Sequence, residues 1–271
     1  MHALSFALDP DLRFDRALAT STLSPLVGRE AELRQVLGAW GRAREGRGSF
    51  VLLSGEAGIG KSRLIQEVRL RVPSSTSIRL RCQCWSQFAN SAFHPIIKML
   101  QHLFRLDAEG SPGDNLARLE AHLGTLGLEP EHMALIATFL SLPVKENLPI
   151  LQLSPERQKE RTFEALTELL LRMARGRPVL AVVEDLHWAD PSTLELLGFL
   201  LNRVEPARVL LLLSARPGFQ HAAWSSTGPL LRVNLERLPA RLTAALVQGS
   251  AGGRELSRET VRQLVEKTDG I

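Results

Sequence analysis

The sequence lacks an apolar run long enough to cross a membrane. Its longest runs, Val179–Val183 and Val209–Leu213, fall far short of the roughly 20 residues that a membrane-spanning helix needs. A secretory signal is missing too, because the N-terminal stretch carries Asp9, Asp11 and Asp15 in place of a basic start and an apolar core. We therefore expect a cytoplasmic chain without a membrane partner.

Cysteine is scarce, with Cys82 and Cys84 as the only two residues of this type. They alternate with polar residues in a strand-like stretch, which places both side chains on one apolar face. A metal site would need further ligands at suitable spacing, and the scattered histidines do not supply them. Core packing is therefore the expected role of both cysteines.

A compact basic patch is also missing. The formal net charge is +4 and the pI is near 9.6, but the arginines behind these values are spread along predicted helices. The sequence shows neither a winged-helix nor a helix-turn-helix segment, so nucleic acid is not indicated as a partner. An apolar content of 44% is enough to bury a full core in one large or two modest domains.

What the sequence does contain is a glycine-rich octapeptide directly after a short apolar strand, Phe50–Ser54. The octapeptide, Gly55-Glu56-Ala57-Gly58-Ile59-Gly60-Lys61-Ser62, fits the P-loop pattern G-x-x-x-x-G-K-[ST]. Its glycines let consecutive backbone N–H groups turn inward around an anion, and the next helix points its positive end at the same place. Lys61 can reach the β- and γ-phosphates of a nucleotide, and the Ser62 hydroxyl can ligate Mg²⁺. A glycine-rich turn without a nucleotide is the alternative.

Two acidic residues end a second apolar run, Val179–Asp185. A run without alternation is typical of a central parallel strand that is covered on both faces. Glu184 and Asp185 would then lie at the sheet edge where ligands bind, beside the octapeptide. Arg216 follows a further predicted strand and reaches the same edge. A solvated turn is the alternative for the two acids, and an exposed turn residue is the alternative for the arginine.

Strands that alternate with helices predict an α/β fold with a doubly wound parallel sheet, although the order of the strands is not readable. Strands are expected at Phe50–Ser54, Ser77–Cys84, Val179–Asp185, Arg208–Ser214 and Leu231–Leu235. Helices are expected near 31–37, 61–68, 95–106, 114–126, 131–141, 155–175, 191–197, 239–249 and 257–268. We expect residues 1–22 to be a linker or tail, 23–237 to form the core with a helical insert at about 95–141, and 238–271 to begin a truncated C-terminal helical subdomain.

Together these segments resemble the STAND-type signal-transduction ATPases of the AAA-like P-loop superfamily. The match is closest to the ATPase module that follows adenylate/guanylate cyclase or protein kinase domains in large bacterial regulators, often labelled an origin-recognition-complex-like AAA domain. The resemblance covers roughly residues 24–271. The segments that carry it, in the order of the family, are Leu26–Glu30, Gly55–Ser62, Val182–Pro191 and Ser214–Pro217.

The resemblance implies a role for each segment. The turn that lies against the adenine corresponds to Val27, Gly28 and Arg29. Glu184 would hold Mg²⁺, Asp185 would polarise the attacking water, and Arg216 would sense the γ-phosphate. Many relatives have aspartate as the first acid, so the resemblance leaves open how Glu184 and Asp185 divide metal binding and catalysis. His187 and Trp188 belong to the motif of the family, and we expect them to be structural.

The resemblance therefore implies an ATP-binding regulatory switch of a signal-transduction protein that hydrolyses ATP slowly. Its catalytic residues would be Lys61, Asp185 and Arg216, its ligands ATP or ADP with Mg²⁺, and its partners fused signalling domains or other proteins. A nucleotide-binding interaction module without catalysis and a nucleotide-dependent DNA-binding ATPase are the alternatives. Gly270 and Ile271 would begin a Gly-x-Pro motif of the family, so we expect the chain to be cut short.

Overall fold

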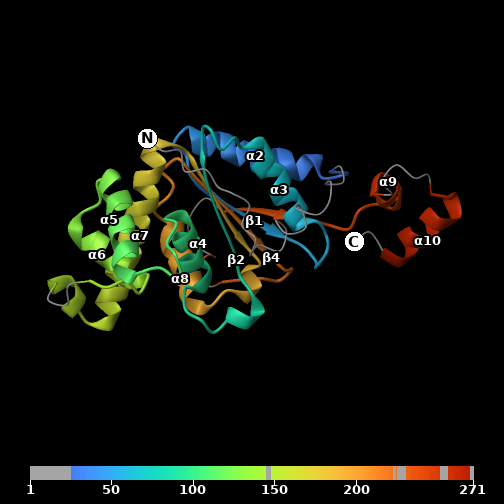
Figure 1. Ribbon diagram of the computed structural model, residues 1–271. Helices are drawn as coiled ribbons and strands as arrows, with labels where there is room; N and C mark the ends of the chain where they lie inside the picture. The colour runs from blue at the N-terminus through green and yellow to red at the C-terminus, as the bar shows by residue number, and fades with distance from the viewer. Residues whose placement is uncertain (1–25, 145–147, 222–223, 225–229, 251–255, 269–271) are drawn as a thin grey trace.

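The computed structural model describes residues 26–144, 148–221, 224, 230–250 and 256–268. A five-stranded parallel sheet lies at its centre (Figure 1). Its strands are β1 (Ser49–Ser54), β2 (Ile78–Gln83), β3 (Val179–Glu184), β4 (Val209–Ala215) and β5 (Leu230–Asn234). The five predicted strands are confirmed to within one residue at each end. Their spatial order is β2-β3-β4-β1-β5.

Burial along each strand explains its place in the sheet. Every residue of β3 and of β4 is buried, as expected of continuous apolar runs at the centre of a parallel sheet. β2 lies at one edge, and its residues alternate between buried and half-buried until Cys82. β5 lies at the other edge and is the most exposed strand. Cys82 and Cys84 are buried thiols within the core, so the predicted packing role is confirmed.

Helices cover both faces of the sheet, which confirms the doubly wound arrangement. Val51 and Leu53 pack with α2 (Glu30–Arg44) and α3 (Lys61–Arg71) on one face. The alternate β1 residues, Phe50 and Leu52, belong to the larger core on the other face. The helices that contribute to this larger core include α4 (His94–Leu103), α7 (Pro155–Gly176) and α8 (Pro191–Leu201).

The helices predicted between residues 95 and 141 are present. α4 contacts β2 and α8, whereas α5 (Pro112–Thr125) and α6 (Pro130–Phe139) lie beside α7 at one end of the molecule (Figure 1). Short 3₁₀ turns occur at η1 (Ser86–Phe88), η2 (Pro149–Gln152) and η3 (Leu186–Trp188). Ser154 occupies the N-cap position of α7, but its side chain makes no capping hydrogen bond. Asp190 does cap α8, where its carboxylate accepts a hydrogen bond from the Thr193 N–H.

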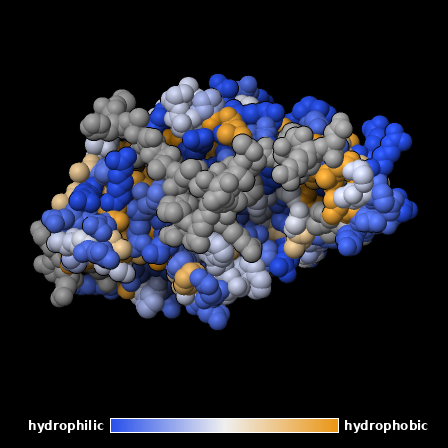
Figure 2. All heavy atoms as spheres, turned by 45° about the vertical axis from the view of Figure 1, so that its right-hand side comes forward, coloured by the Kyte–Doolittle hydropathy of each residue, from blue (hydrophilic) through white to orange (hydrophobic). Residues whose placement is uncertain are grey.

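The C-terminal helices, α9 (Ala240–Ser250) and α10 (Arg258–Thr268), lie beyond the sheet at the opposite end from α5 and α6 (Figure 1). Polar side chains cover much of the described surface in Figure 2, and apolar side chains gather at the end that carries these two helices. Among the described helices, none combines the length and apolarity needed to span a bilayer. The expectations for residues 1–22, and those for Gly270 and Ile271, fall outside the described residues.

Candidate functional site

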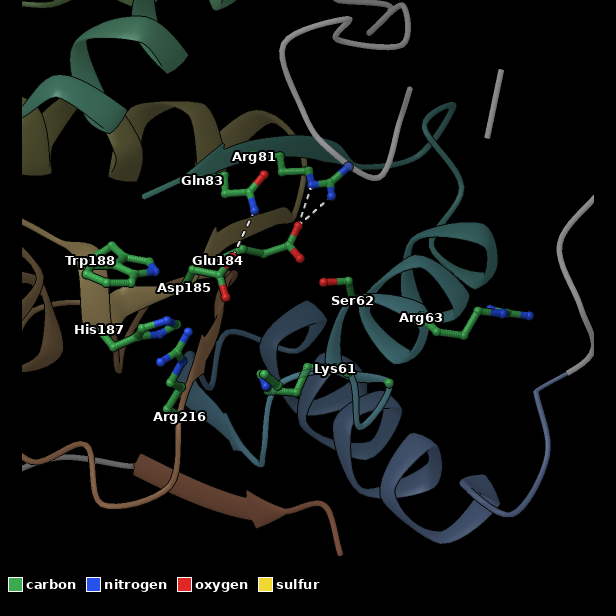
Figure 3. Close-up of a pocket in the computed structure, with 13 residues that line it drawn as sticks. Lys61, Ser62, Arg63, Arg81, Gln83, Glu184, Asp185, His187, Trp188 and Arg216 are labelled. Carbon is green, nitrogen blue, oxygen red and sulfur yellow. Dashed lines mark hydrogen bonds and ion pairs between the residues drawn. The ribbon is translucent and has the colours of Figure 1, made fainter. Parts of the chain in front are cut away.

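A cavity of about 390 Å³ lies at the C-terminal edge of the sheet, where the glycine-rich loop meets the ends of β3 and β4 (Figure 3). Its lining brings together residues singled out from the sequence for phosphate, metal or catalysis, namely Ala57, Gly58, Gly60, Lys61, Ser62, Glu184, Asp185 and Arg216. It also contains residues to which the sequence assigned no chemistry, above all Arg81 and Gln83 of β2. Residues far apart in the chain thus form one site, because the C-terminal ends of parallel strands lie at the same edge of the sheet.

The loop between β1 and α3 holds Lys61 in place. Gly60 precedes α3 with φ of 101°, a left-handed conformation that glycine adopts without steric cost. The Lys61 ammonium donates hydrogen bonds to the carbonyl oxygens of Gly55 and Glu56, both at 2.8 Å. Burial lowers the pKa of Lys61 and nearby Arg216 lowers it further, whereas Asp185 and Glu184 act in the opposite direction. The lysine therefore lies along the loop, with its ammonium bound to two loop carbonyls.

Glu184 forms a buried ion pair with an arginine from the neighbouring strand. The Arg81 guanidinium contacts one Glu184 carboxylate oxygen through Nε at 2.7 Å and through a terminal nitrogen at 2.5 Å. The two side chains are only 6% and 1% exposed. Removing either partner would leave the other charge buried without compensation, which is costly. The first acid of the strand is therefore held by Arg81 in this structure.

Asp185 is held as well, but by weaker contacts. Gln83 donates a hydrogen bond from its amide nitrogen to Asp185 Oδ2 at 2.8 Å, and the Asp185 backbone N–H donates to Ser214 Oγ at 3.0 Å. Asp185 has φ of 60°, in a left-handed region that is uncommon for residues other than glycine. Backbone conformations of this kind cluster at active sites and ligand-binding sites. Asp185 lines the same cavity as Lys61 (Figure 3).

The lining of the cavity also includes Arg216, His187 and Trp188. The Arg216 guanidinium lies 5.6 Å from the centre of the Trp188 ring, within range of a cation–π contact. Trp188 is 38% exposed, which is unusual for so large an apolar side chain. Burial is the main cause that lowers the pKa of His187; Arg216 and Lys61 add to this effect, and Asp185 opposes it. A neutral His187 therefore lies beside the cations of the site.

The turn expected against the adenine lies next to the glycine-rich loop but not in the lining of the cavity. Gly28 has φ of 70°, and a Cβ there would come within 2.7 Å of Leu242. The Arg29 guanidinium donates to the carbonyl oxygens of Ile59 at 3.3 Å and Glu236 at 2.5 Å. Arg29 thus ties the phosphate loop to the segment that follows β5. The adenine-binding role of this turn stays a prediction.

The oxygen atoms around the cavity suit Mg²⁺ better than a softer metal. Ser62, Glu184 and Asp185 supply a hydroxyl and two carboxylates, which are hard ligands. Within the described residues, no group of three or more His, Cys, Asp and Glu side chains could hold a metal ion by itself. Mg²⁺ is commonly bound through one or two protein oxygens together with substrate phosphates.

Comparison with known proteins decides the family. A family model described as "AAA ATPase domain" matches residues 25–213, which is well over half of the chain. The chain belongs to the AAA ATPase domain family. The match includes the glycine-rich loop and both acids, and it ends two residues before the last residue of β4. The coarse function of a nucleotide-binding ATPase module follows from this membership.

Two curated relatives are much longer than this chain. An uncharacterized protein of Rhizobium meliloti (strain 1021) is 30% identical over 243 residues, covering 89% of this chain and 23% of the relative. Hybrid signal transduction histidine kinase G of Dictyostelium discoideum is 29% identical over 179 residues, covering 65% of this chain and 5% of the kinase. The chain therefore spans less than a quarter of each of these two relatives.

Solved structures give weaker likenesses. A STAND protein with a tetratricopeptide repeat sensor from Pyrococcus horikoshii has a TM-score of 0.44 at 15% identity, covering 91% of this chain and 29% of that one. The Aeropyrum pernix ORC1 protein, solved in complex with DNA, has a TM-score of 0.45 at 17% identity, covering 83% and 50% of the two chains. Likenesses at this level carry no information on activity or partners.

Proposed function

We propose that the chain is an ATP-binding regulatory switch module of a signal-transduction protein and that it hydrolyses ATP slowly. The observation that carries this proposal is the convergence of Lys61, both acids and Arg216 on the cavity beside the glycine-rich loop. Phosphoryl transfer needs little covalent chemistry from a protein and depends on positioning and charge compensation. The residues of this cavity supply both.

Each residue has a distinct task in the proposed reaction. Lys61 exchanges its contacts with the loop carbonyls for the β- and γ-phosphates of ATP. Asp185 accepts a hydrogen bond from the attacking water and orients it, while Arg216 stabilises the charge that develops on the γ-phosphate. When Mg²⁺ is bound, it neutralises phosphate oxygens, and the Ser62 hydroxyl and the Glu184 carboxylate are the residues that would hold it.

The contacts of the two acids support slow turnover. Arg81 holds the Glu184 carboxylate, and Gln83 occupies one oxygen of Asp185. Metal binding and water activation therefore each require a side chain of β2 to release or share an acid. A reaction that has to wait for such exchanges is slower than one whose acids already face the substrate.

The same contacts favour a second candidate, a binding module in which ATP is a structural ligand without turnover. If Arg81 never releases Glu184, the site binds the nucleotide but does not complete the reaction. Phosphate release at saturating ATP and Mg²⁺ separates the two candidates. The switch predicts slow release that depends on Asp185, whereas the binding module predicts release no faster than that of a chain carrying Lys61→Ala.

The signalling context is part of the proposal. One curated relative is named as a signal-transduction histidine kinase, and this chain covers only a small share of it. We propose that the module works in the cytoplasm and acts on fused signalling domains or protein partners. Pull-down with purified candidate domains in ATP and in ADP tests this, because a switch must bind a partner differently in its two nucleotide states.

A further inference from the structure

A second cavity, of about 640 Å³, adjoins the first. Its walls are the end of β2, the turn that contains η1, and one side of α4, and Arg81 and Gln83 line both cavities. Its size falls within the roughly 300–1,000 Å³ that is typical of small-molecule sites. The reaction proposed above uses none of its residues on α4 or in the turn.

The ionisable side chains that line this second cavity include several basic residues and no acidic one. His94, Lys98 and His102 line it from α4, and no aspartate or glutamate belongs to its lining. The three residues are spaced by four positions, so they form one stripe along the helix. Arg81 also belongs to the lining and is paired with Glu184, so Lys98 is the remaining permanent cation of the lining. A lysine in a lining that contains no carboxylate favours an anionic ligand.

A flat aromatic surface lies beside this charge. The rings of Phe88 and His94 are stacked, with centroids 3.7 Å apart and planes inclined by 15°. Burial lowers the pKa of His94 and Lys98 adds to this effect, whereas Asp190 opposes it, so the ring stays largely neutral near pH 7 and can stack as a neutral aromatic. Trp85 supplies another aromatic side chain of the lining. Such surfaces stack with nucleobases of any sequence.

The start of α4, which carries His94, is anchored to the core. Phe93, which precedes α4, has φ of 58°, and its backbone N–H donates to Asp190 Oδ1 at 3.1 Å. Asp190 is 2% exposed, and the same oxygen also caps α8. The Phe93 ring makes edge contacts with Phe139 and Phe163 at centroid distances of 5.2 and 5.8 Å. The cavity therefore has a fixed wall, which lowers the entropic cost of binding.

We propose that this second cavity binds a nucleoside monophosphate, with the base stacked on the Phe88–His94 pair and the phosphate beside Lys98. The amides of Gln87 and Gln101 lie in the same lining and can donate to or accept from a base edge. A single phosphate matches the single lysine of the lining, whereas the glycine-rich loop is the polyphosphate site. The proposal does not depend on ATP hydrolysis at the first cavity.

Calorimetric titration tests this site directly. AMP, GMP and CMP are each titrated into the chain after a non-hydrolysable ATP analogue and Mg²⁺ have saturated the first cavity, and again into a Lys61→Ala chain. We expect at least one of the three to bind with one-to-one stoichiometry in both titrations. The matching nucleoside, which lacks the phosphate, and ribose 5-phosphate, which lacks the base, should both bind more weakly.

Three variants assign the contacts. Lys98 is exposed, so Lys98→Ala should leave the fold intact while weakening monophosphate binding by about tenfold or more, through loss of a charge-assisted contact. Phe88→Leu should weaken binding of the nucleoside as well as of the monophosphate. Lys267→Ala, at an exposed position of α10, is the matched control and should change nothing.

Three results would overturn the proposal. The first is that none of the monophosphates binds at millimolar concentration. The second is that binding occurs but Lys98→Ala and Phe88→Leu, each shown to be folded by its unfolding transition, leave it unchanged. The third is that the ATP analogue displaces the monophosphate, which would place the monophosphate in the first cavity.

Discussion

The glycine-rich loop and strand β2 contribute to the same cavity, but only the role of the loop can be recognised from the sequence alone. Residues 55–62 form a contiguous motif, so each position can be read from its neighbours. Arg81 and Gln83 become meaningful only because β2 pairs with β3 in a register that sets Gln83 opposite Glu184. A chemical role that depends on strand pairing is invisible to local pattern analysis. The predictions below test this contrast.

The largest expected effect is a loss of stability when Arg81 of β2 is replaced. Arg81→Ala should reduce the free energy of unfolding by about 3–5 kcal/mol, because it leaves the Glu184 carboxylate buried without its partner. Urea unfolding measures the loss. Arg47→Ala, which removes an exposed pair with Glu45, is the matched control and should have little effect. Equal losses in the two variants would show that burial of the Arg81 pair has no energetic consequence.

A change in the glycine-rich loop should mainly weaken the binding of ATP. Lys61→Ala should weaken ATP binding by about 2–3 kcal/mol, or tenfold and more, because a charge-assisted contact to phosphate is lost. Calorimetric titration in the presence of Mg²⁺ measures this change. Lys267→Ala should bind ATP like the parent. An unchanged affinity in Lys61→Ala would remove the glycine-rich loop from the nucleotide site.

Gly28 combines features of the loop and of β2. The Val27-Gly28-Arg29 turn can be recognised in the sequence, but its contacts in the fold cannot. Gly28→Ala should destabilise the fold by roughly 1–3 kcal/mol, because a φ of 70° is strained for a residue with a Cβ and the new Cβ would have to displace the end of the Leu242 side chain. Gly41→Ala, in the open interior of α2, should instead stabilise by roughly 0.5–1 kcal/mol. Thermal unfolding of the two variants measures both signs. A loss of stability at both positions would contradict this account.

The smallest expected effect is a dependence of the free energy of unfolding on pH. Burial holds the pKa of Lys61 below its ordinary value of 10.5, so the folded chain binds fewer protons than the unfolded chain between these two values. The free energy of unfolding should therefore rise with pH in that window. Lys61→Met should lack this contribution when urea unfolding is compared at neutral and alkaline pH. A parent whose stability shows the same slope as Lys61→Met would rule out the burial of the ammonium.

Much of the architecture was readable from the sequence because its signals are local. The five strands and the loop motif each follow from short patterns. The order β2-β3-β4-β1-β5 was not readable, because it depends on contacts between residues far apart in the chain. The stripe His94, Lys98 and His102 could have been noticed as basic residues spaced by four positions, whereas the pairing of Arg81 with Glu184 could not. Only the fold shows what they face.

The central claim is that Asp185 activates water at a site where the glycine-rich loop binds ATP. The most direct measurement is phosphate release at saturating ATP and Mg²⁺ by the parent and by Asp185→Asn, with ATP affinity determined for both. We expect the parent to release phosphate slowly, and Asp185→Asn to bind ATP with similar affinity but to lose about 10²–10⁴-fold in rate, as expected for removal of a general base. Release at the parent rate by Asp185→Asn would contradict the claim.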